Sequence, residues 1–80
     1  MRLDKFLKVS RIIKRRTIAN EACDASHVKV NGKSAKASYE VKIDDVVEIT
    51  FGTKTLRVQV KSIIDSTKKA DASEMYDVLS

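Results

Sequence analysis

The stretch RTIANEACDASHVKVNGK, residues 16–33, changes its hydrophobic period halfway along. Small apolar residues recur at helical spacing in its first part, which predicts a helix over residues 16–25 with Thr17 near its N-cap. The residues expected on the buried face of this helix are Ala19, Ala22 and Cys23. From His27 onward apolar and polar residues alternate, as they do in a half-buried strand. A helix followed directly by a strand is thus the starting unit of the fold.

The dipeptide Asn31-Gly32 predicts a tight turn after this strand, because both residue types tolerate a positive φ angle. Two further strands are indicated downstream, DVVEITF at residues 45–51 and TLRVQVKSII at residues 55–64, with a turn between them. Alternation within the second of these predicts one buried and one solvated face.

Upstream of residue 16, apolar residues at helical spacing predict a first helix over residues 3–9. The expected fold is therefore α+β, with two N-terminal helices packed on a small, mostly antiparallel sheet. We expect one domain over residues 1–65 and a short C-terminal tail, residues 66–80, that docks on the same domain. A short helix is expected to start near Ala72.

Positive charge is concentrated at the start of the chain. The first sixteen residues carry seven basic side chains and one acid, Asp4, a local net charge of +6 in a chain whose total is +5. The seven basic residues are Arg2, Lys5, Lys8, Arg11, Lys14, Arg15 and Arg16. Such one-sided charge is typical of proteins that bind a phosphate backbone. Lys14, Arg15 and Arg16 lie at the N-terminus of the helix predicted over residues 16–25. The free N–H groups at a helix N-terminus also attract phosphate.

Residues for catalysis or metal binding are scarce. His27 is the only histidine, and no His, Cys, Asp or Glu cluster has the spacing of metal ligands. The pair Asp44-Asp45 is typical of a turn before a strand. We therefore expect no catalytic residue, no metal and no cofactor.

The single cysteine and the length of the apolar segments indicate the compartment. Cys23 cannot form an internal disulfide, and we interpret it as a buried helix residue in a protein from a reducing compartment. No segment approaches the length of a membrane span. A cytoplasmic protein without membrane contact is expected.

Several short motifs occur in the order and at the spacing of one family. They are RLD at residues 2–4 with Leu7, RT at residues 16–17 with Ala19, VKVNG at residues 28–32, and Val41 with Asp45. On these motifs the chain resembles the RNA-binding domain of the ribosomal protein S-four type, also called the alpha-L RNA-binding motif, over roughly residues 1–50. Ser26 and Asp44 stand where that family usually has glycine, which suggests slightly different turns.

The small stand-alone members of this family resemble the chain over a longer stretch, which includes TKKADASEMY at residues 67–76. These serve ribosome-associated quality control or belong to the fifteen-kilodalton ribosomal heat-shock proteins. The resemblance implies binding to rRNA of the large ribosomal subunit and to peptidyl-tRNA on obstructed subunits. It also implies support for a tailing factor that recruits alanyl-tRNA, so that the stalled peptide gains a C-terminal alanine tail. Off the ribosome we expect a monomer.

The candidate RNA-binding residues combine the basic segment with polar residues of the family motifs. They are Arg2, Lys5, Arg11, Lys14, Arg15, Arg16, Thr17, Asn20, Lys29, Asn31 and Lys33. The cations are expected to contact phosphates, and the polar side chains to donate to sugar or phosphate. Asp4 is expected to support this surface by holding a neighbouring arginine such as Arg16. Because Arg16 stands at a helix start, we expect its removal to change folding stability little.

Other functions remain open at this point. The same residues suit a general module for structured RNA or for DNA, or a heat-shock ribosome recycling factor without a tailing role. The module also often precedes RNA-modifying domains, but 80 residues hold no such domain. A helix-turn-helix protein would usually dimerise to read paired half-sites, and the sequence shows no obvious dimer surface.

Overall fold

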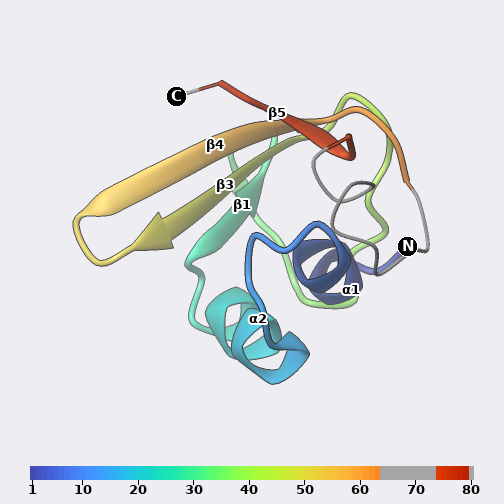
Figure 1. Cartoon of the computed structure of the whole chain (residues 1–80). Coiled ribbons are helices and arrows are strands. Elements are labelled where there is room, and N and C mark those ends of the chain that lie inside the picture. Colours follow the sequence, from blue (N-terminus) through green and yellow to red (C-terminus); the bar gives the residue numbers. More distant parts are fainter. Residues whose placement is uncertain (64–73, 80) are drawn as a thin grey trace.

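A computed structural model describes residues 1–63 and 74–79 of the chain (Figure 1). Two helices come first in the sequence, and the strands of a single sheet follow. The elements are α1 (Leu3–Val9), α2 (Arg16–Asp24), β1 (Val28–Val30), β2 (Lys33–Ser34), β3 (Val46–Phe51), β4 (Lys54–Val60) and β5 (Tyr76–Val78). The α+β class predicted from the sequence is confirmed.

The five strands are ordered β2-β1-β3-β4-β5, and every neighbouring pair is antiparallel. The turn predicted at Asn31-Gly32 joins β1 to β2, and both of its residues have positive φ angles, 53° and 84°. Gly52 likewise begins the two-residue turn between β3 and β4. Tight turns therefore set the register of both hairpins.

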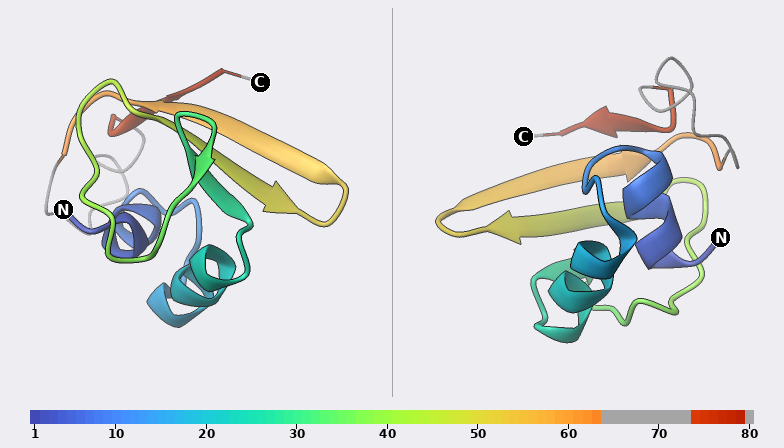
Figure 2. Two further views of the ribbon diagram at one scale, coloured as in Figure 1. Left: turned by 180° about the vertical axis from the view of Figure 1, so that it is seen from behind. Right: turned by 60° about the horizontal axis from the view of Figure 1, so that its bottom comes forward.

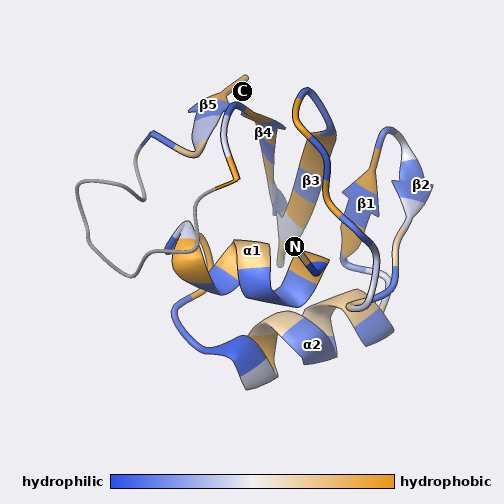
Figure 3. Ribbon diagram, turned by 90° about the vertical axis from the view of Figure 1, so that its right-hand side faces the viewer, coloured by the Kyte–Doolittle hydropathy of each residue, from blue (hydrophilic) through white to orange (hydrophobic). Residues whose placement is uncertain are grey.

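Both helices lie on one face of the sheet, as the views from behind and below show (Figure 2). The alternation of the strands explains this packing, because inward residues such as Val28, Ile49 and Val58 are fully buried while their neighbours face solvent. From α1, Leu3, Phe6 and Leu7 complete this core with no exposed surface. Figure 3, seen from the right-hand side of Figure 1 and coloured by hydropathy, shows polar and apolar residues alternating along both helices.

The C-terminal part differs from the sequence-based expectation. The last long strand ends at Val60, four residues earlier than predicted, and it begins at Lys54. Residues 76–78 form β5 beside β4, so the short helix expected from Ala72 is wrong at these positions. Ala72 itself lies outside the described residues. The backbone of 76–78 is extended because it pairs with β4, a partner that local sequence does not reveal.

Each helix is followed, directly after its C-cap, by a non-glycine residue in the left-handed conformation. Ser26 follows the C-cap of α2 with φ 61°, and Arg11 follows the C-cap of α1 with φ 62°. At α2 the N–H of Ser26 donates to the Cys23 carbonyl and the N–H of His27 to the Ala22 carbonyl, the two bonds of a Schellman motif. Glycine is the usual residue at this position.

Asp44, the second departure from the family pattern, also has a positive φ angle, 76°. Ser26 and Asp44 therefore occupy the backbone conformation that glycine adopts most readily.

Candidate nucleic-acid interface

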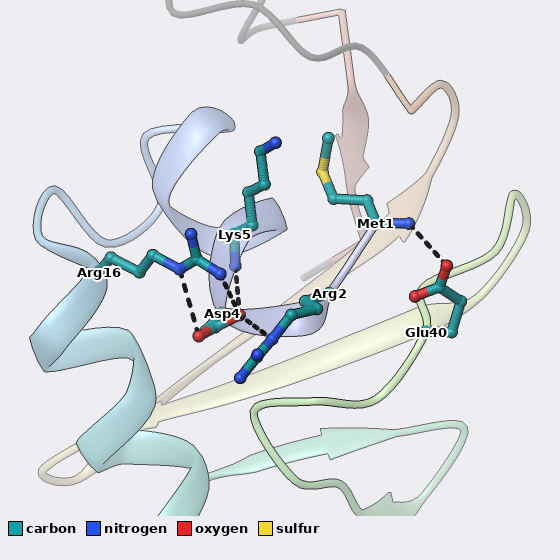
Figure 4. A network of polar contacts seen from close by, with 6 residues as sticks. All are labelled: Met1, Arg2, Asp4, Lys5, Arg16 and Glu40. Carbon is teal, nitrogen blue, oxygen red and sulfur yellow. Dashed lines mark hydrogen bonds and ion pairs between the residues drawn. The ribbon is translucent and has the colours of Figure 1, made fainter.

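The buried carboxylate of Asp4 lies between the side chains of Arg2 and Arg16 (Figure 4). Its Oδ1 accepts from the backbone N–H of Lys5 at 2.8 Å and lies 3.3 Å from Nε of Arg2. Its Oδ2 lies 3.3 Å from Nε of Arg16, which provides the expected contact between α1 and α2. We call Arg2, Asp4 and Arg16 the Asp4 cluster.

Figure 4 shows the two arginines of this cluster approaching Asp4 from opposite sides. Their side chains remain 51% and 46% exposed, whereas that of Asp4 is 3% exposed. Each guanidinium therefore has one edge on a fixed carboxylate and other N–H groups directed at solvent. An arginine held in this way loses less side-chain freedom when it binds a phosphate.

The pKa of Asp4 reflects two opposing effects. Burial by itself raises it, but the hydrogen bonds from Arg16 and from the Lys5 backbone, with the charges of Arg16 and Arg2, lower it by more. The net result is a pKa below the usual value, so Asp4 is a carboxylate at neutral pH. The Asp4–Arg16 contact also changes the expectation for Arg16, because removing it takes a charged partner from a buried group.

A shallow hollow of about 380 Å³ lies beside the Asp4 cluster. It is lined by Asp4, Arg16, Thr17, Asn20 and Glu21. Thr17 is the second residue of α2, whose N-cap is Arg15, and no side chain caps the helix N-terminus. The first turn of α2 also contains no acid. The uncapped N–H groups, the helix dipole and the arginines all favour an anion at this end.

Other predicted residues of the basic segment lie around α1. The ammonium end of Lys5 points away from Asp4 (Figure 4). Arg11 and Lys14 line a different hollow, which they share with Lys8 and Val9. Sequence reasoning did not include Lys8 among the site residues. Its position three residues before Arg11 and four after Asp4, at helical spacing, is the signal that could have indicated it.

The three predicted residues of the β1–β2 region are not part of the Asp4 cluster. Lys29 is exposed between two buried valines and faces Glu48 of β3, so it lies on the sheet face opposite the helices. Asn31 uses its side chain within the fold, where Nδ2 donates to Asp45 and Oδ1 accepts from the Val46 N–H. Lys33 lines a third hollow, between β2 and residues 35–39. RNA contact by these residues stays a prediction.

Within residues 1–63 and 74–79, no group of three or more His, Cys, Asp or Glu side chains is placed to hold a metal ion. Cys23 is buried in α2, and burial together with the nearby Asp4 and Asp24 raises the pKa of its thiol to about 11. A neutral thiol of this kind is a poor nucleophile. No helix in the described part of the chain has the length and apolarity needed to cross a membrane.

The chain is similar to known proteins in both sequence and fold. The family model of the S4 domain matches residues 1–47. The chain is 59% identical to the RQC P-site tRNA stabilizing factor of Streptococcus pneumoniae, over 100% of this chain and 91% of that protein. It is 53% identical to the protein of the same name from Bacillus subtilis, over 99% of this chain and 92% of that one.

Among solved structures, heat shock protein 15 of Vibrio cholerae superimposes with a TM-score of 0.90 at 28% identity, over 98% of this chain and 80% of that one. The fold of the chain, its helices and its sheet, is therefore shared with that solved structure. The chain belongs to the S4 domain family, within the family of the RQC P-site tRNA stabilizing factors.

Proposed function

We propose that this chain is a non-catalytic RNA-binding protein that acts in ribosome-associated quality control. It would bind rRNA of the large ribosomal subunit together with the P-site peptidyl-tRNA and hold that tRNA in place. The similarity over the full chain to proteins named RQC P-site tRNA stabilizing factor supports this role. The observation that carries the proposal at the level of chemistry is the Asp4 cluster.

The cluster suits phosphate binding because its two arginines are positioned before any ligand arrives. Asp4 anchors Arg2 by its Nε and Arg16 by its Nε and Nη2. The remaining guanidinium N–H groups are left to donate to phosphate oxygens. Thr17 and Asn20, which share the hollow beside Arg16, would add hydrogen bonds to sugar or phosphate. Binding would then depend on backbone and shape more than on base sequence.

A tRNA held in this way would stay in one translational position while another factor acts on it. We infer that this chain supports C-terminal alanine tailing by a factor that recruits alanyl-tRNA, as the family resemblance implies. We further propose that it works as a monomer off the ribosome. The Vibrio cholerae heat shock protein 15 is described as trimeric, so the sedimentation of the isolated protein should be measured alongside.

A heat-shock ribosome recycling factor without a tailing role is the second candidate, favoured by the structural match to heat shock protein 15. The two candidates differ in one measurable product. Deleting the gene should abolish alanine tails on stalled peptides if the first proposal holds. Tails that persist at wild-type length in the deletion strain would favour the second.

Co-sedimentation of the full chain with large ribosomal subunits that carry a P-site tRNA tests the binding itself. Wild type should migrate with the subunits, and Arg16→Ala should not. The matched control is Arg57→Ala, because Arg57 is 49% exposed and its Nε pairs with Glu48 at 3.5 Å, but on the sheet face opposite the helices. If Arg57→Ala lowers co-sedimentation as much as Arg16→Ala does, the interface has been assigned to the wrong surface.

A further inference from the structure

The hollow between β2 and residues 35–39 contains an aromatic side chain that the Asp4 cluster lacks. It encloses about 650 Å³, a size within the range of about 300–1,000 Å³ that is usual for small-ligand sites. Its lining combines one aromatic ring with ammonium and hydroxyl groups, those of Tyr39, Lys33, Lys36, Ser34 and Ser38. We call it the Tyr39 hollow.

The side chain of Tyr39 is held at both ends. Its phenolic O–H donates to Oδ2 of Asp45 at 3.0 Å, and its backbone N–H donates to the Lys36 carbonyl at 3.0 Å. The carboxylate of Asp45 is in turn fixed, because its Oδ1 accepts from Nδ2 of Asn31 at 3.1 Å. Asp45 is buried, with 8% of its surface exposed. The aromatic ring therefore has a defined position before any ligand arrives.

Core packing accounts for only part of the Tyr39 side chain. Tyr39 packs against the hydrophobic core but remains half-buried, and it also lines the hollow. An aromatic ring that is held by its hydroxyl and open to a hollow offers a surface on which a planar group can stack. Aromatic side chains beside cations are the combination that proteins use to bind unpaired nucleotides, because every base has a π-face.

The segment that forms the hollow is bonded directly to the start of α1. The N–H of Leu3 donates to the Tyr39 carbonyl at 2.8 Å, and the N–H of Asp4 donates to the Ala37 carbonyl at 3.2 Å. Glu40, the next residue of this segment, is paired with the N-terminal ammonium at 3.2 Å (Figure 4). The Tyr39 hollow therefore adjoins the Asp4 cluster, and one RNA strand can reach both.

From these observations we infer that the Tyr39 hollow receives an unpaired nucleotide of the RNA that the Asp4 cluster binds. The base stacks on the ring of Tyr39, and Lys33 and Lys36 contact the flanking phosphates. Asn31 and Asp45 are positioning residues, since they act through Tyr39. Stacking of this kind tolerates any base, in agreement with binding by backbone and shape. The inference rests on the proposed RNA-binding function and adds a contact to it.

NMR of the full chain with labelled tyrosine tests the stacking directly. The chain has two tyrosines, and Tyr76 is an internal control because β5 and β2 lie at opposite edges of the sheet. One probe is an RNA hairpin with an unpaired loop, and the other is the same hairpin with loop nucleotides that lack bases. The ring protons of Tyr39 should shift with the first hairpin and not with the second, while those of Tyr76 should shift with neither.

Affinities of variants for the first hairpin and for large ribosomal subunits that carry a P-site tRNA test the same contact. Tyr39→Leu should weaken binding to both by about fivefold or more. Tyr39→Phe loses the bond to Asp45 but keeps the ring, so it should restore most of the affinity that Tyr39→Leu loses. Lys36→Ala should reduce the slope of log affinity against log salt by about 0.7.

Matched controls remove the same groups elsewhere on the molecule. Tyr76→Leu removes an aromatic ring from β5, and Lys54→Ala removes a positive charge at the tip of the β3–β4 hairpin. Both should bind like wild type. Thermal melts show which variants are folded at the temperature of the binding measurement. If Tyr39→Leu is not, the NMR comparison on wild-type protein still decides.

Equal binding by wild type and Tyr39→Leu, or a Tyr39 shift that is the same with and without bases, would overturn the inference and leave the proposed function intact. If Tyr39→Leu loses subunit binding but keeps wild-type affinity for the hairpin, the hollow takes a protein segment and the RNA assignment is wrong. Wild type that binds the subunits but not the hairpin would also contradict a site for an unpaired nucleotide.

The remaining outcomes separate the inference from the proposed function. If wild type binds the hairpin but not the subunits, the proposed function fails, and the hairpin data still decide on the hollow. Wild-type protein that binds neither probe would overturn both.

Discussion

The guanidinium of Arg16 lies against the carboxylate of Asp4, twelve residues earlier in the chain, with Nε 3.3 Å from Oδ2 and Nη2 3.5 Å from Oδ1. One residue belongs to α2 and the other to α1, so this contact joins the two helices as well as positioning a candidate phosphate ligand. Arg16 therefore has a structural role beside the RNA-binding role that we propose for it, and its replacement should affect both stability and binding.

Arg16→Ala should lower the free energy of unfolding by about 1–2 kcal/mol, because the buried Asp4 loses one charged partner and keeps Arg2 and the Lys5 N–H. Thermal melts measure the change in stability, and co-sedimentation of the same protein with large ribosomal subunits measures the change in binding. The double variant Asp4→Asn/Arg16→Ala should regain part of the stability but none of the binding. Binding restored in the double variant would mean that Arg16 acts only through the fold.

The pH dependence of stability should report on Asp4. Its pKa is lower in the folded chain than in the unfolded chain, so its contribution is present above about pH 4 and is lost as pH falls through the lowered folded value. Urea unfolding between pH 2 and 7 should therefore show a steeper acid loss in wild type than in Asp4→Asn. Parallel curves for the two proteins would contradict this assignment.

Relief of left-handed strain should stabilise the protein at two exposed positions. Ser26→Gly and Asp44→Gly should each raise the free energy of unfolding by about 0.5–1 kcal/mol, because their φ angles are 61° and 76°. Asn31→Gly is the contrasting variant, since its side chain bonds Asp45 and the Val46 N–H, and it should lose stability. Chemical denaturation of the three variants would show whether the signs differ in this way.

Met75 provides a test of whether the C-terminal tail docks on the same domain. Its side chain is fully buried, and its carbonyl accepts from the N–H groups of Lys61 and Ser62. Met75→Ala should therefore cost about 2–5 kcal/mol, comparable with Leu7→Ala in α1. Val78→Ala, at a side chain that is 61% exposed, should change the unfolding midpoint little. A Met75→Ala protein as stable as wild type would mean that the tail does not unfold together with the rest of the domain.

The thiol of Cys23 should be unreactive in the folded chain, because burial and nearby acids raise its pKa to about 11. At pH 8, iodoacetamide should label it only as fast as the protein opens, and urea should accelerate labelling strongly. Since the neutral thiol is the form that the fold favours, stability should also decline as pH rises from about 8.5, the usual thiol pKa, towards 11. Labelling at equal rates with and without urea would contradict burial.

Much of the fold followed from local pattern. The helix over residues 3–9 agrees with α1, and the turn at Asn31-Gly32 has the φ angles that its residue types favour. Both signals depend on residues close in sequence, which is why they could be interpreted without a structure. The end of β4 and the extended backbone of β5 depend on pairing with distant strands, and there the local pattern was misleading.

A basic N-terminal segment before a small α+β sheet domain can be predicted from the residues alone, because charge and periodicity are properties of the sequence. How that charge is divided between sites depends on tertiary packing. Packing of α2 on α1 buries Asp4 between Arg2 and Arg16, while the left-handed turn at Arg11 groups it with Lys8 and Lys14 in a separate hollow. Charge adds up along a chain, but a binding site needs donors that converge in space, and convergence depends on how distant segments pack.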